Sequence, residues 1–338
     1  MIRIHSQHSL QAYNTFGVDV NAKYFAEVHT VEELQDILHT EQLKASSLLV
    51  LGGGSNMLLT KDYDGFVLKM SIKGMDVREE GDAVFINAGG GEVWNDFVQF
   101  CVNRGYAGVE NLSLIPGSVG ASPIQNIGAY GVEMKDCFYS LQACEISTGN
   151  MRTFTREECR FGYRDSVFKN ELRGQYIITS VLFRLSKTAK LNLSYGAIEE
   201  ELQRRGITHP TIKDVSDVVS HIRVSKLPDP STIGNSGSFF KNPVIGENDF
   251  KNLQHKFPEV VHYPAGEGKV KIAAGWLIEQ CGWKGKVHGH TGTWKNQALV
   301  VVNHGGATGK EIYDFSAMII DSVRERFGVT LEREVNIF

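Results

Sequence analysis

Three glycine-rich segments before residue 132 have the composition of loops that bind phosphate groups. They are residues 52–56, residues 88–91 and the long aperiodic segment 115–131. Because glycine has no side chain, backbone N–H groups in such loops can approach a pyrophosphate closely. Each loop alone could be a tight turn, and the three could be unrelated surface loops. Together they favour a large polyphosphate-containing ligand that follows a line of backbone donors.

The first glycine loop departs from the two common nucleotide-binding motifs. Met57 stands where the dinucleotide-binding fingerprint requires glycine, and no Gly-Lys-Ser/Thr sequence follows the loop. Residues 58–59 continue an extended pattern instead of opening a helix. A strand-loop-strand cradle for phosphate therefore remains, with a tight turn as the alternative.

Four polar side chains lie in contexts that suit anion binding or proton transfer. Arg164 stands among aromatic residues, where its planar guanidinium could bind a carboxylate or could pair with Asp165 on an exposed strand. Ser238 precedes two phenylalanines, so its hydroxyl could donate a proton in a water-poor pocket or could cap a turn. Glu332 and Glu334 share one face of a terminal strand, which either presents carboxylates to a pocket or protects a sheet edge.

Composition and charge exclude several classes of protein. The 35 basic and 39 acidic residues give a formal net charge of −4, which is no basic surplus for nucleic-acid or anionic-membrane binding. No apolar run reaches signal or membrane-spanning length, and five cysteines without a Cys-x-x-Cys pair are typical of free thiols in a reducing cytoplasm. His288 and His290 could share a metal ion, but no third ligand is specified, so we expect no metal site.

The hydrophobic periodicity of the sequence predicts the helices and strands that hold these residues. The chain of 338 residues is long enough for two to three domains. Thr30 and Glu33 predict a capping box at the start of a helix. The apolar strand 48–51 then leads directly into the first glycine loop. A second helix carries Trp94 and ends at Gly105.

The second half of the chain contains a linker and a compact final unit. Residues 214–223 predict a short helix with an acidic start and a basic end, and Pro228 and Pro230 mark the clearest linker. Beyond the linker we expect helix 272–281, strand 297–302, helix 310–327 with a capping box at Thr308 and Glu311, and strand 329–338. The last strand could return to an earlier sheet.

Six segments together resemble one enzyme family, the bacterial UDP-N-acetylenolpyruvoylglucosamine reductases, over nearly the whole chain. The segments are 14–17, 51–56, 115–133, 159–164, 226–230 and 237–243. Those at 115–133 and 237–243 are the most specific of the six. The Tyr130 segment and the length of the third unit resemble the type of this family in which a tyrosine-bearing loop closes over substrate.

The resemblance implies an α+β fold in three parts. Residues 1–70 and 71–227 would form the two subdomains of an FAD-binding fold of the vanillyl-alcohol-oxidase type. Residues 228–328 would form a C-terminal α/β substrate-binding domain, and the terminal strand 329–338 would return to the second subdomain.

The resemblance also implies a reaction. In this family NADPH reduces non-covalently bound FAD, and flavin N5 passes hydride to the enolpyruvyl group, which yields UDP-N-acetylmuramate for peptidoglycan. Arg164 and Glu334 would polarise the substrate carboxylate, and Ser238 would protonate the carbanion. A serine can serve because a carbanion is a strong base. We expect a cytoplasmic monomer that binds neither nucleic acid nor membrane.

The remaining site residues follow from the same resemblance. FAD would be held by Gly52, Gly53, Gly54, Ser55, Asn56, Ser118, Gly120, Ser122, Ile124 and Gly128. The UDP-sugar would be bound by Tyr130, Tyr195, Lys226, Asn242 and Gln297. One departure from the family pattern is Arg333, which stands between the two glutamates where the family commonly has proline.

Two other functions stay open at the level of sequence. A flavin-dependent oxidase of the same fold would act on an alcohol and need not accept hydride from NADPH. A non-enzymatic nucleotide-sugar binder, or an unrelated hydrolase, would carry no flavin. The colour of the purified protein therefore separates the second group from the flavoenzymes.

Overall fold

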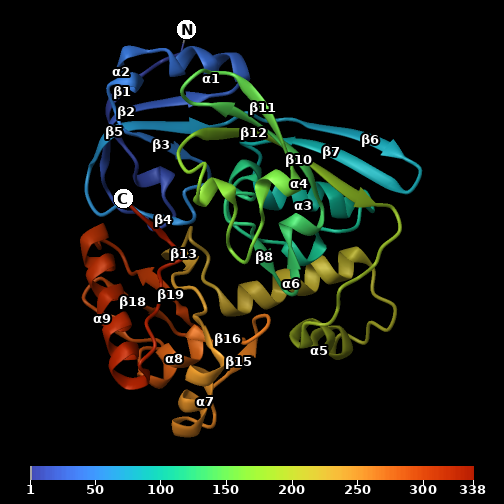
Figure 1. Cartoon of the computed structure of the whole chain (residues 1–338), viewed down its shortest axis with the longest axis vertical. Coiled ribbons are helices and arrows are strands. Elements are labelled where there is room, and N and C mark those ends of the chain that lie inside the picture. Colours follow the sequence, from blue (N-terminus) through green and yellow to red (C-terminus); the bar gives the residue numbers. More distant parts are fainter. Residues whose placement is uncertain (1) are drawn as a thin grey trace. The chain divides into compact units, whose positions relative to one another are not determined.

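The structure, a computed structural model, describes residues 2–338 and divides into two compact units (Figure 1). Unit 1 comprises the residues up to His8, Ala22–Gly53 and Asp64–Arg223, and unit 2 comprises Ser9–Asn21, Gly54–Tyr63 and Val224–Phe338. The chain passes between the units inside the first glycine loop, after Gly53, and inside a helix, after Arg223. The division into 1–70, 71–227 and 228–328 stays a prediction.

The first sheet of unit 1 has four strands and packs against two short helices. The strand order is β1 (His5–Ser9), β2 (Asn21–Val28), β5 (Tyr63–Met70) and β3 (Leu48–Leu51), and the helices are α1 (Val31–Leu38) and α2 (Glu41–Lys44). The Glu33 N–H donates to the Thr30 hydroxyl at 3.1 Å, which confirms the predicted helix start. Leu34 of α1 packs against Phe66 in the buried core. The predicted strand before the first glycine loop is confirmed as β3.

The second sheet of unit 1 has five antiparallel strands that pack against one helix. The strand order is β11 (Met151–Thr155), β10 (Phe138–Glu145), β12 (Tyr176–Ser186), β7 (Ala83–Gly89) and β6 (Met75–Glu80), and the helix is α3 (Trp94–Asn103). Trp94 and Phe97 are fully buried, and the Phe97 ring centroid lies 4.5 Å from that of Phe183 on β12. Gly105, with φ +77°, follows the helix as predicted.

Short elements connect these sheets and carry much of the candidate site. They are α4 (Arg156–Cys159), the strand pair β8 (Gly128–Ala129) and β9 (Val132–Glu133), and the 3-10 helices η1 (Gln11–Tyr13), η2 (Glu110–Leu112), η3 (Val119–Ala121), η4 (Met134–Asp136) and η5 (Val167–Lys169).

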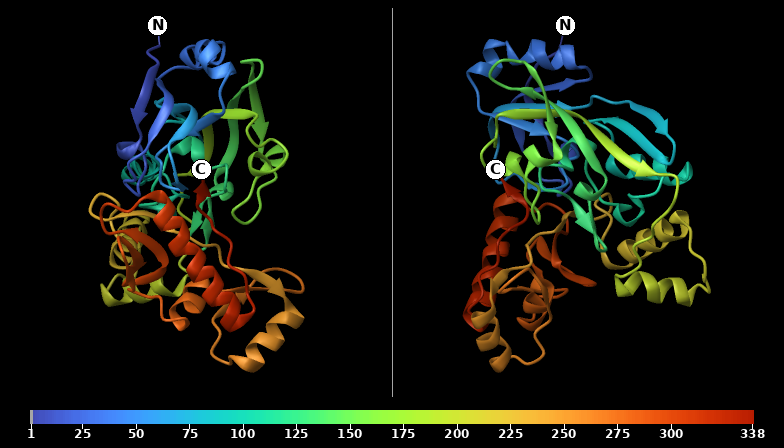
Figure 2. Two further views of the ribbon diagram at one scale, coloured as in Figure 1. Left: turned by 90° about the vertical axis from the view of Figure 1, so that its left-hand side faces the viewer. Right: turned by 45° about the vertical axis from the view of Figure 1, so that its right-hand side comes forward.

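Two helices, α5 (Gly196–Arg204) and α6 (Ile212–Lys226), lie side by side and share a small core (Figures 1 and 2). The core consists of Ile198, Leu202, Val215, Val218, Val219 and Ile222. The predicted helix 214–223 is confirmed and is longer in both directions. The Asp214 N–H donates to the Thr211 hydroxyl at 3.2 Å, and the Thr211 N–H donates to the Asp214 carboxylate at 2.8 Å. This reciprocal cap sets the earlier start.

The larger elements of unit 2 are two sheets and three α-helices. One sheet has the order β13 (Gly234–Ser238), β19 (Gln297–Asn303), β18 (Thr291–Trp294) and β17 (Val287–His288), and the other has the order β14 (Val244–Gly246), β16 (Lys269–Ile272) and β15 (His262–Pro264). The helices are α7 (Glu247–Lys256), α8 (Ala274–Gln280) and α9 (Gly309–Phe327). The capping box of Thr308 and Glu311 and the left-handed Gly328 confirm the predicted bounds of α9.

The chain end pairs in two places instead of forming one long strand. Only β20 (Asn336–Ile337) is a strand, and it lies parallel to β4 (Met57–Leu58). Arg333 forms a separate antiparallel bridge with Phe240. The expected strand over 329–338 is therefore shorter, and it pairs with residues 57–58 and not with the segment 71–227.

The cysteines are free thiols, and four of the five are buried: Cys101, Cys137, Cys144 and Cys159. Burial raises the pKa of Cys137 and of Cys159 to about 12. Within residues 2–338, no helix combines the length and the apolar composition needed to span a membrane.

Candidate active site

The three glycine-rich segments pack against one another in unit 1, so the hypothesis of unrelated surface loops is wrong. A Cβ atom on Gly53 would lie 2.9 Å from the Gly117 Cα atom. A Cβ atom on Gly120 would lie 2.9 Å from the Gly90 Cα atom, and the Gly120 N–H donates to the Gly90 carbonyl at 2.9 Å. Backbones can approach this closely only without side chains. We call residues 52–53, 89–91 and 117–120 the glycine cradle.

The first glycine loop carries donors and a cation that suit a pyrophosphate. The N–H groups of Gly53, Gly54 and Ser55 donate no hydrogen bond within residues 2–338. The Lys69 Nζ atom on β5 donates to the Gly52 carbonyl at 2.9 Å, and burial lowers the pKa of Lys69. Open backbone donors beside a partly buried ammonium group form a site for negatively charged oxygens.

Three further residues predicted at the FAD site are held by contacts within unit 1. The Ser118 side chain packs directly on Gly52. The buried Ser122 hydroxyl donates to a carbonyl of its own 3-10 turn at 2.7 Å. The Ile124 side chain is exposed, and its carbonyl accepts the Ser166 hydroxyl at 2.6 Å. These residues therefore shape the loop through backbone position and packing.

Arg164 is held beside the Tyr130 loop. Its φ of +54° is uncommon for a residue with a side chain. Its Nη2 atom donates to the Gly128 carbonyl at 2.6 Å, and its guanidinium carbon lies 5.4 Å from the centre of the Tyr163 ring. Asp165, the alternative partner considered from sequence, accepts the Asn170 amide at 3.0 Å. The guanidinium is therefore oriented before any ligand binds.

Two predicted substrate residues come together with an arginine that the sequence did not single out. The ring centroids of Tyr130 and Tyr195 are 5.2 Å apart at an interplanar angle of 79°. The charge of Arg223, on α6, opposes the rise that burial causes in the pKa of Tyr130, and the Arg223 Nε atom donates to the Leu114 carbonyl at 3.2 Å. Burial lowers the pKa of Arg223, and the charge of Arg164 lowers it further. Two guanidinium groups that repel each other favour the binding of an anion.

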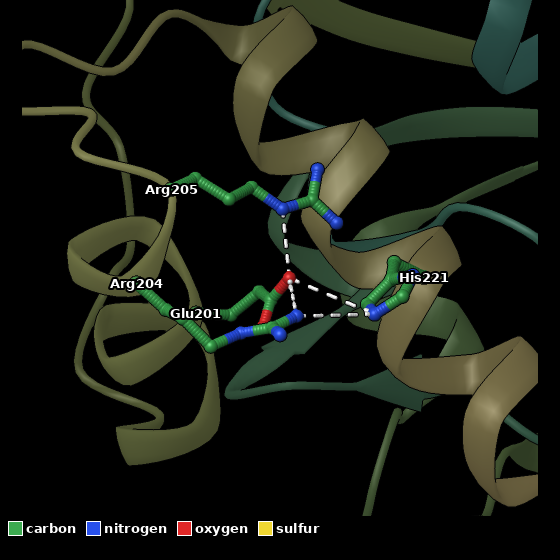
Figure 3. Close-up of polar contacts among 4 residues, drawn as sticks. All are labelled: Glu201, Arg204, Arg205 and His221. Atoms are coloured by element: carbon green, nitrogen blue, oxygen red, sulfur yellow. Dashed lines mark hydrogen bonds and ion pairs between the residues drawn. The ribbon is translucent and has the colours of Figure 1, made fainter.

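Helix α5, which follows Tyr195, and helix α6, which carries Arg223, are joined by a cluster of charged groups (Figure 3). The Glu201 carboxylate accepts Nε and Nη2 of Arg204 at 2.8 Å and Nε of Arg205 at 2.7 Å. The Nε2 atom of His221, on α6, lies 3.7 Å from the Glu201 Oε1 atom. Hydrogen bonds from the two arginines lower the pKa of Glu201 to about 2.

Ser238 and Glu334 lie on paired backbone segments of unit 2. The Glu334 N–H donates to the carbonyl of Phe239, the residue that follows Ser238, at 2.8 Å. The Ser238 side chain is exposed, whereas the rings of Phe239 and Phe240 are buried in the core. The two rings therefore do not cover the serine within unit 2, and the predicted water-poor pocket at Ser238 stays a prediction.

The neighbours of Glu334 have different partners. Glu332 forms an ion pair with Lys241, so its charge is matched. The Arg333 Nε atom donates to the Ser316 hydroxyl of α9 at 2.8 Å. Glu334 itself is half-buried. The expectation of two carboxylates that face one pocket stays a prediction for Glu334, whereas the Glu332 carboxylate is paired with Lys241.

Two predicted substrate residues of unit 2 present amide donors. The Asn242 Oδ1 atom accepts the Ala274 N–H at the start of α8 at 2.9 Å, and the Gln297 Oε1 atom accepts the Leu299 N–H at 3.2 Å. Because both carbonyl oxygens are engaged, the NH₂ groups are the parts that can meet a ligand, and they suit phosphate oxygens. Lys226 is exposed at the end of α6, and its ammonium group also suits phosphate oxygens.

His288 and His290 make separate contacts. The His290 Nδ1 atom lies 3.0 Å from the Gly305 carbonyl oxygen, and the His288 ring stacks at 6.0 Å on Phe315. Among residues 2–338, no group of three or more His, Cys, Asp or Glu side chains is arranged to hold a metal ion.

Comparison with known proteins gives the same two-part organisation. Residues 229–338 match the family profile described as UDP-N-acetylenolpyruvoylglucosamine reductase, C-terminal domain, and residues 22–155 match an FAD binding domain. UDP-N-acetylenolpyruvoylglucosamine reductase of Flavobacterium johnsoniae is 52% identical over 338 residues, which is 99% of this chain and 100% of the relative. The reductase of Pseudomonas aeruginosa is 48% identical over 98% of this chain and 97% of its own. The fold is similar to the crystal structure of the reductase from Thermus caldophilus, with a TM-score of 0.69 and 24% identity over 100% of this chain and 99% of that chain.

The α+β fold, the glycine cradle and the matched FAD binding domain define an FAD-containing oxidoreductase. The first glycine loop fits the cofactor, because its open N–H groups and Lys69 would hold the pyrophosphate. More particularly, the chain belongs to the UDP-N-acetylenolpyruvoylglucosamine reductase family, which confirms the resemblance and the fold class predicted from sequence.

Sequence reasoning missed three residues of the candidate site. Lys69 belongs to a strand that pairs in parallel with the strand before the first glycine loop, and only that register brings it to Gly52. Arg223 was visible as the basic end of a helix, but nothing in the sequence indicated its contact with Tyr130. Asn111 gave no signal, because its partners are 19 and 81 residues away along the chain.

Proposed function

We propose that this chain reduces the enolpyruvyl double bond of UDP-N-acetylenolpyruvoylglucosamine to give UDP-N-acetylmuramate, with NADPH as the reductant. Membership of the family over the whole chain supports this substrate. We further propose that the protein works as a cytoplasmic monomer in peptidoglycan precursor synthesis. FAD is held without a covalent bond, mainly by the residues of the first glycine loop and the cradle.

The three catalytic residues manage the negative charge that the reaction develops. When bound, FAD would supply the hydride that the terminal carbon of the enolpyruvyl group receives. Arg164, oriented by its bond to Gly128, binds the substrate carboxylate with paired donors. Glu334, as a neutral carboxylic acid, donates a hydrogen bond from its O–H to the same carboxylate. Ser238 then donates its proton to the adjacent carbon, and its side chain is exposed in unit 2.

The remaining polar groups bind the UDP-sugar. Tyr130 and Tyr195 form one aromatic surface, and Arg223 beside them adds a positive charge. Lys226, Asn242 and Gln297 provide donors for the diphosphate and the sugar. All six side chains offer hydrogen-bond donors, as an anionic nucleotide-sugar requires.

The observation that carries the proposal is the backbone pairing of the Ser238 and Glu334 segments. Glu334 is hydrogen-bonded to Phe239, so Ser238 is one residue away from the partner of Glu334. The experiment uses the FAD-loaded Ser238→Ala variant under anaerobic conditions. NADPH should reduce its flavin at the normal rate, whereas reoxidation by the enolpyruvyl substrate should slow about 10²–10⁴-fold, because only proton transfer is removed.

Other outcomes of that experiment identify the alternatives. Normal turnover of Ser238→Ala would refute its assignment as proton donor. A yellow protein that NADPH does not reduce would indicate an alcohol oxidase of the same fold. A colourless protein that does not recover flavin from added FAD would indicate a nucleotide-sugar binder or a hydrolase.

A further inference from the structure

The segments that carry Tyr130 and Tyr195 are joined by one buried side chain, Asn111. It belongs to η2 and is 2% exposed. Its Nδ2 atom donates to the Tyr130 carbonyl at 3.0 Å and to the Asn192 carbonyl at 2.9 Å. A single amide therefore holds two segments that are distant in sequence.

A second asparagine extends the link towards Tyr195. The Asn192 Nδ2 atom donates to the Gly131 carbonyl at 3.1 Å. Its Oδ1 atom accepts the Ser194 hydroxyl at 2.7 Å and the Ser194 N–H at 3.2 Å, and Ser194 directly precedes Tyr195. We call the side chains of Asn111 and Asn192 the amide clamp.

The backbone at Tyr130 needs such support. Tyr130 and Gly131 follow each other with φ values of +49° and +80°. A left-handed residue with a side chain persists only where its surroundings over-determine it. The amide clamp holds both of these carbonyl groups, and the Tyr130 ring then meets the Tyr195 ring edge to face.

We propose that Asn111 is a positioning residue, which sets Tyr130 and Tyr195 in the arrangement that receives the UDP-sugar. This inference rests on the proposed function, in which both tyrosines contact substrate. Without the clamp, substrate binding must first order the two segments, so affinity falls. Proton transfer at Ser238 is a separate event on unit 2 and keeps its rate once substrate is bound.

The test compares variants of the FAD-loaded enzyme. Asn111→Asp keeps the shape of the side chain but replaces the amide donors by oxygen, which faces the same two carbonyl groups. The dissociation constant of UDP-N-acetylenolpyruvoylglucosamine, measured by the change in flavin absorption, should rise about tenfold or more. The kcat at saturating substrate should stay within about twofold, because the clamp acts on binding.

Two further variants separate positioning from simple loss of stability. Val109→Ala removes buried packing beside η2 without touching the clamp, so it should lower the thermal midpoint and leave the dissociation constant unchanged. Asn192→Ala keeps the test decisive if Asn111→Asp does not fold, because Asn192 is only partly buried. Its dissociation constant should rise about threefold to tenfold.

Tyr195→Ala distinguishes failure of this inference from failure of the proposed function. If Tyr195→Ala weakens substrate binding and the clamp variants do not, the inference is overturned while the proposed function stands. If the clamp variants weaken binding no more than Val109→Ala does, the inference is also overturned. If Tyr195→Ala leaves binding unchanged, the substrate role of the tyrosine and the inference fall together.

Discussion

Two candidate site residues of unit 1, Tyr130 and Arg164, stand on irregular backbone, whereas two of unit 2, Ser238 and Glu334, stand on paired segments. Tyr130 and Arg164 both have positive φ values, and the Tyr130 loop is held by bonds from the side chains of Asn111 and Arg164 to backbone carbonyls. Ser238 and Glu334 are held by a ladder of backbone hydrogen bonds. A side-chain substitution can therefore change geometry in unit 1, but in unit 2 it removes chemistry and leaves the backbone in place.

The largest effect is expected for Arg164→Lys. Lysine lacks the planar pair of donors and the fixed bond to the Gly128 carbonyl, so kcat/KM should fall about 10²–10³-fold. Steady-state kinetics measures this loss. Arg160→Lys is the matched control, because Arg160 also has a positive φ, of +46°, but pairs with Glu171 on the surface. Equal losses in the two variants would contradict the role of Arg164.

Glu334 tests whether unit 2 supplies chemistry on an intact backbone. Glu334→Gln keeps a hydrogen-bond donor, so it should retain about tenfold more activity than Glu334→Ala. Both variants should keep normal thermal midpoints, because the ladder bond comes from the backbone N–H. Glu332→Gln should change activity little. If Glu334→Gln and Glu334→Ala lose equal activity, donation by a neutral side chain is the wrong explanation.

Arg333 tests, through the free energy of unfolding, whether backbone pairing in unit 2 is independent of the side chain. The bonds on either side of it run from Glu334 to Phe239 and from Lys241 to Glu332, so the Arg333 N–H takes no part in the ladder. Proline is compatible with such a position.

The Arg333 side chain contributes separately, through Ser316 and through the Tyr313 ring, whose centre is 4.3 Å from the guanidinium carbon. Arg333→Ala should lower the free energy of unfolding by about 1 kcal/mol. Arg333→Pro should recover about 0.4–1 kcal/mol relative to alanine, because it restricts the unfolded chain. Chemical denaturation measures both, and a proline variant less stable than the alanine variant would show that the N–H is needed.

The smallest effect is expected in the pH dependence of stability at Glu201. Its pKa is about 2 in the folded chain and ordinarily 4.5, so the carboxylate contributes stability that is complete above pH 4.5. This contribution is lost as the pH falls towards 2. Glu201→Gln should therefore flatten the unfolding free energy in that window and leave it parallel to the parent above pH 5. An unchanged slope would contradict the cluster in Figure 3.

Local signals predicted elements whose determinants lie within a few residues. The helix over 310–327 was predicted well because its capping box, apolar face and terminal glycine are all in one stretch of sequence. The terminal strand was predicted poorly, because residues 329–338 divide between two partners, at residue 240 and at residues 57–58. Pairing register is set by tertiary contacts that periodicity does not contain.

The same distinction applies to the site. The glycine loops were predictable, because backbones that approach closely require glycine, and glycine is visible in the sequence. The amide of Asn111 and the ammonium group of Lys69 act on residues that the fold alone brings near. Catalytic side chains were placed by family resemblance, whereas the groups that orient them became visible only in the structure.

The buried thiols have a consequence for chemical durability. With a pKa near 12, Cys137 and Cys159 are almost entirely protonated at neutral pH, with a thiolate fraction on the order of 10⁻⁵. Thiolates, and not thiols, react with peroxides and electrophiles. Cys137 and Cys159 are therefore expected to resist oxidation and alkylation as long as the chain stays folded.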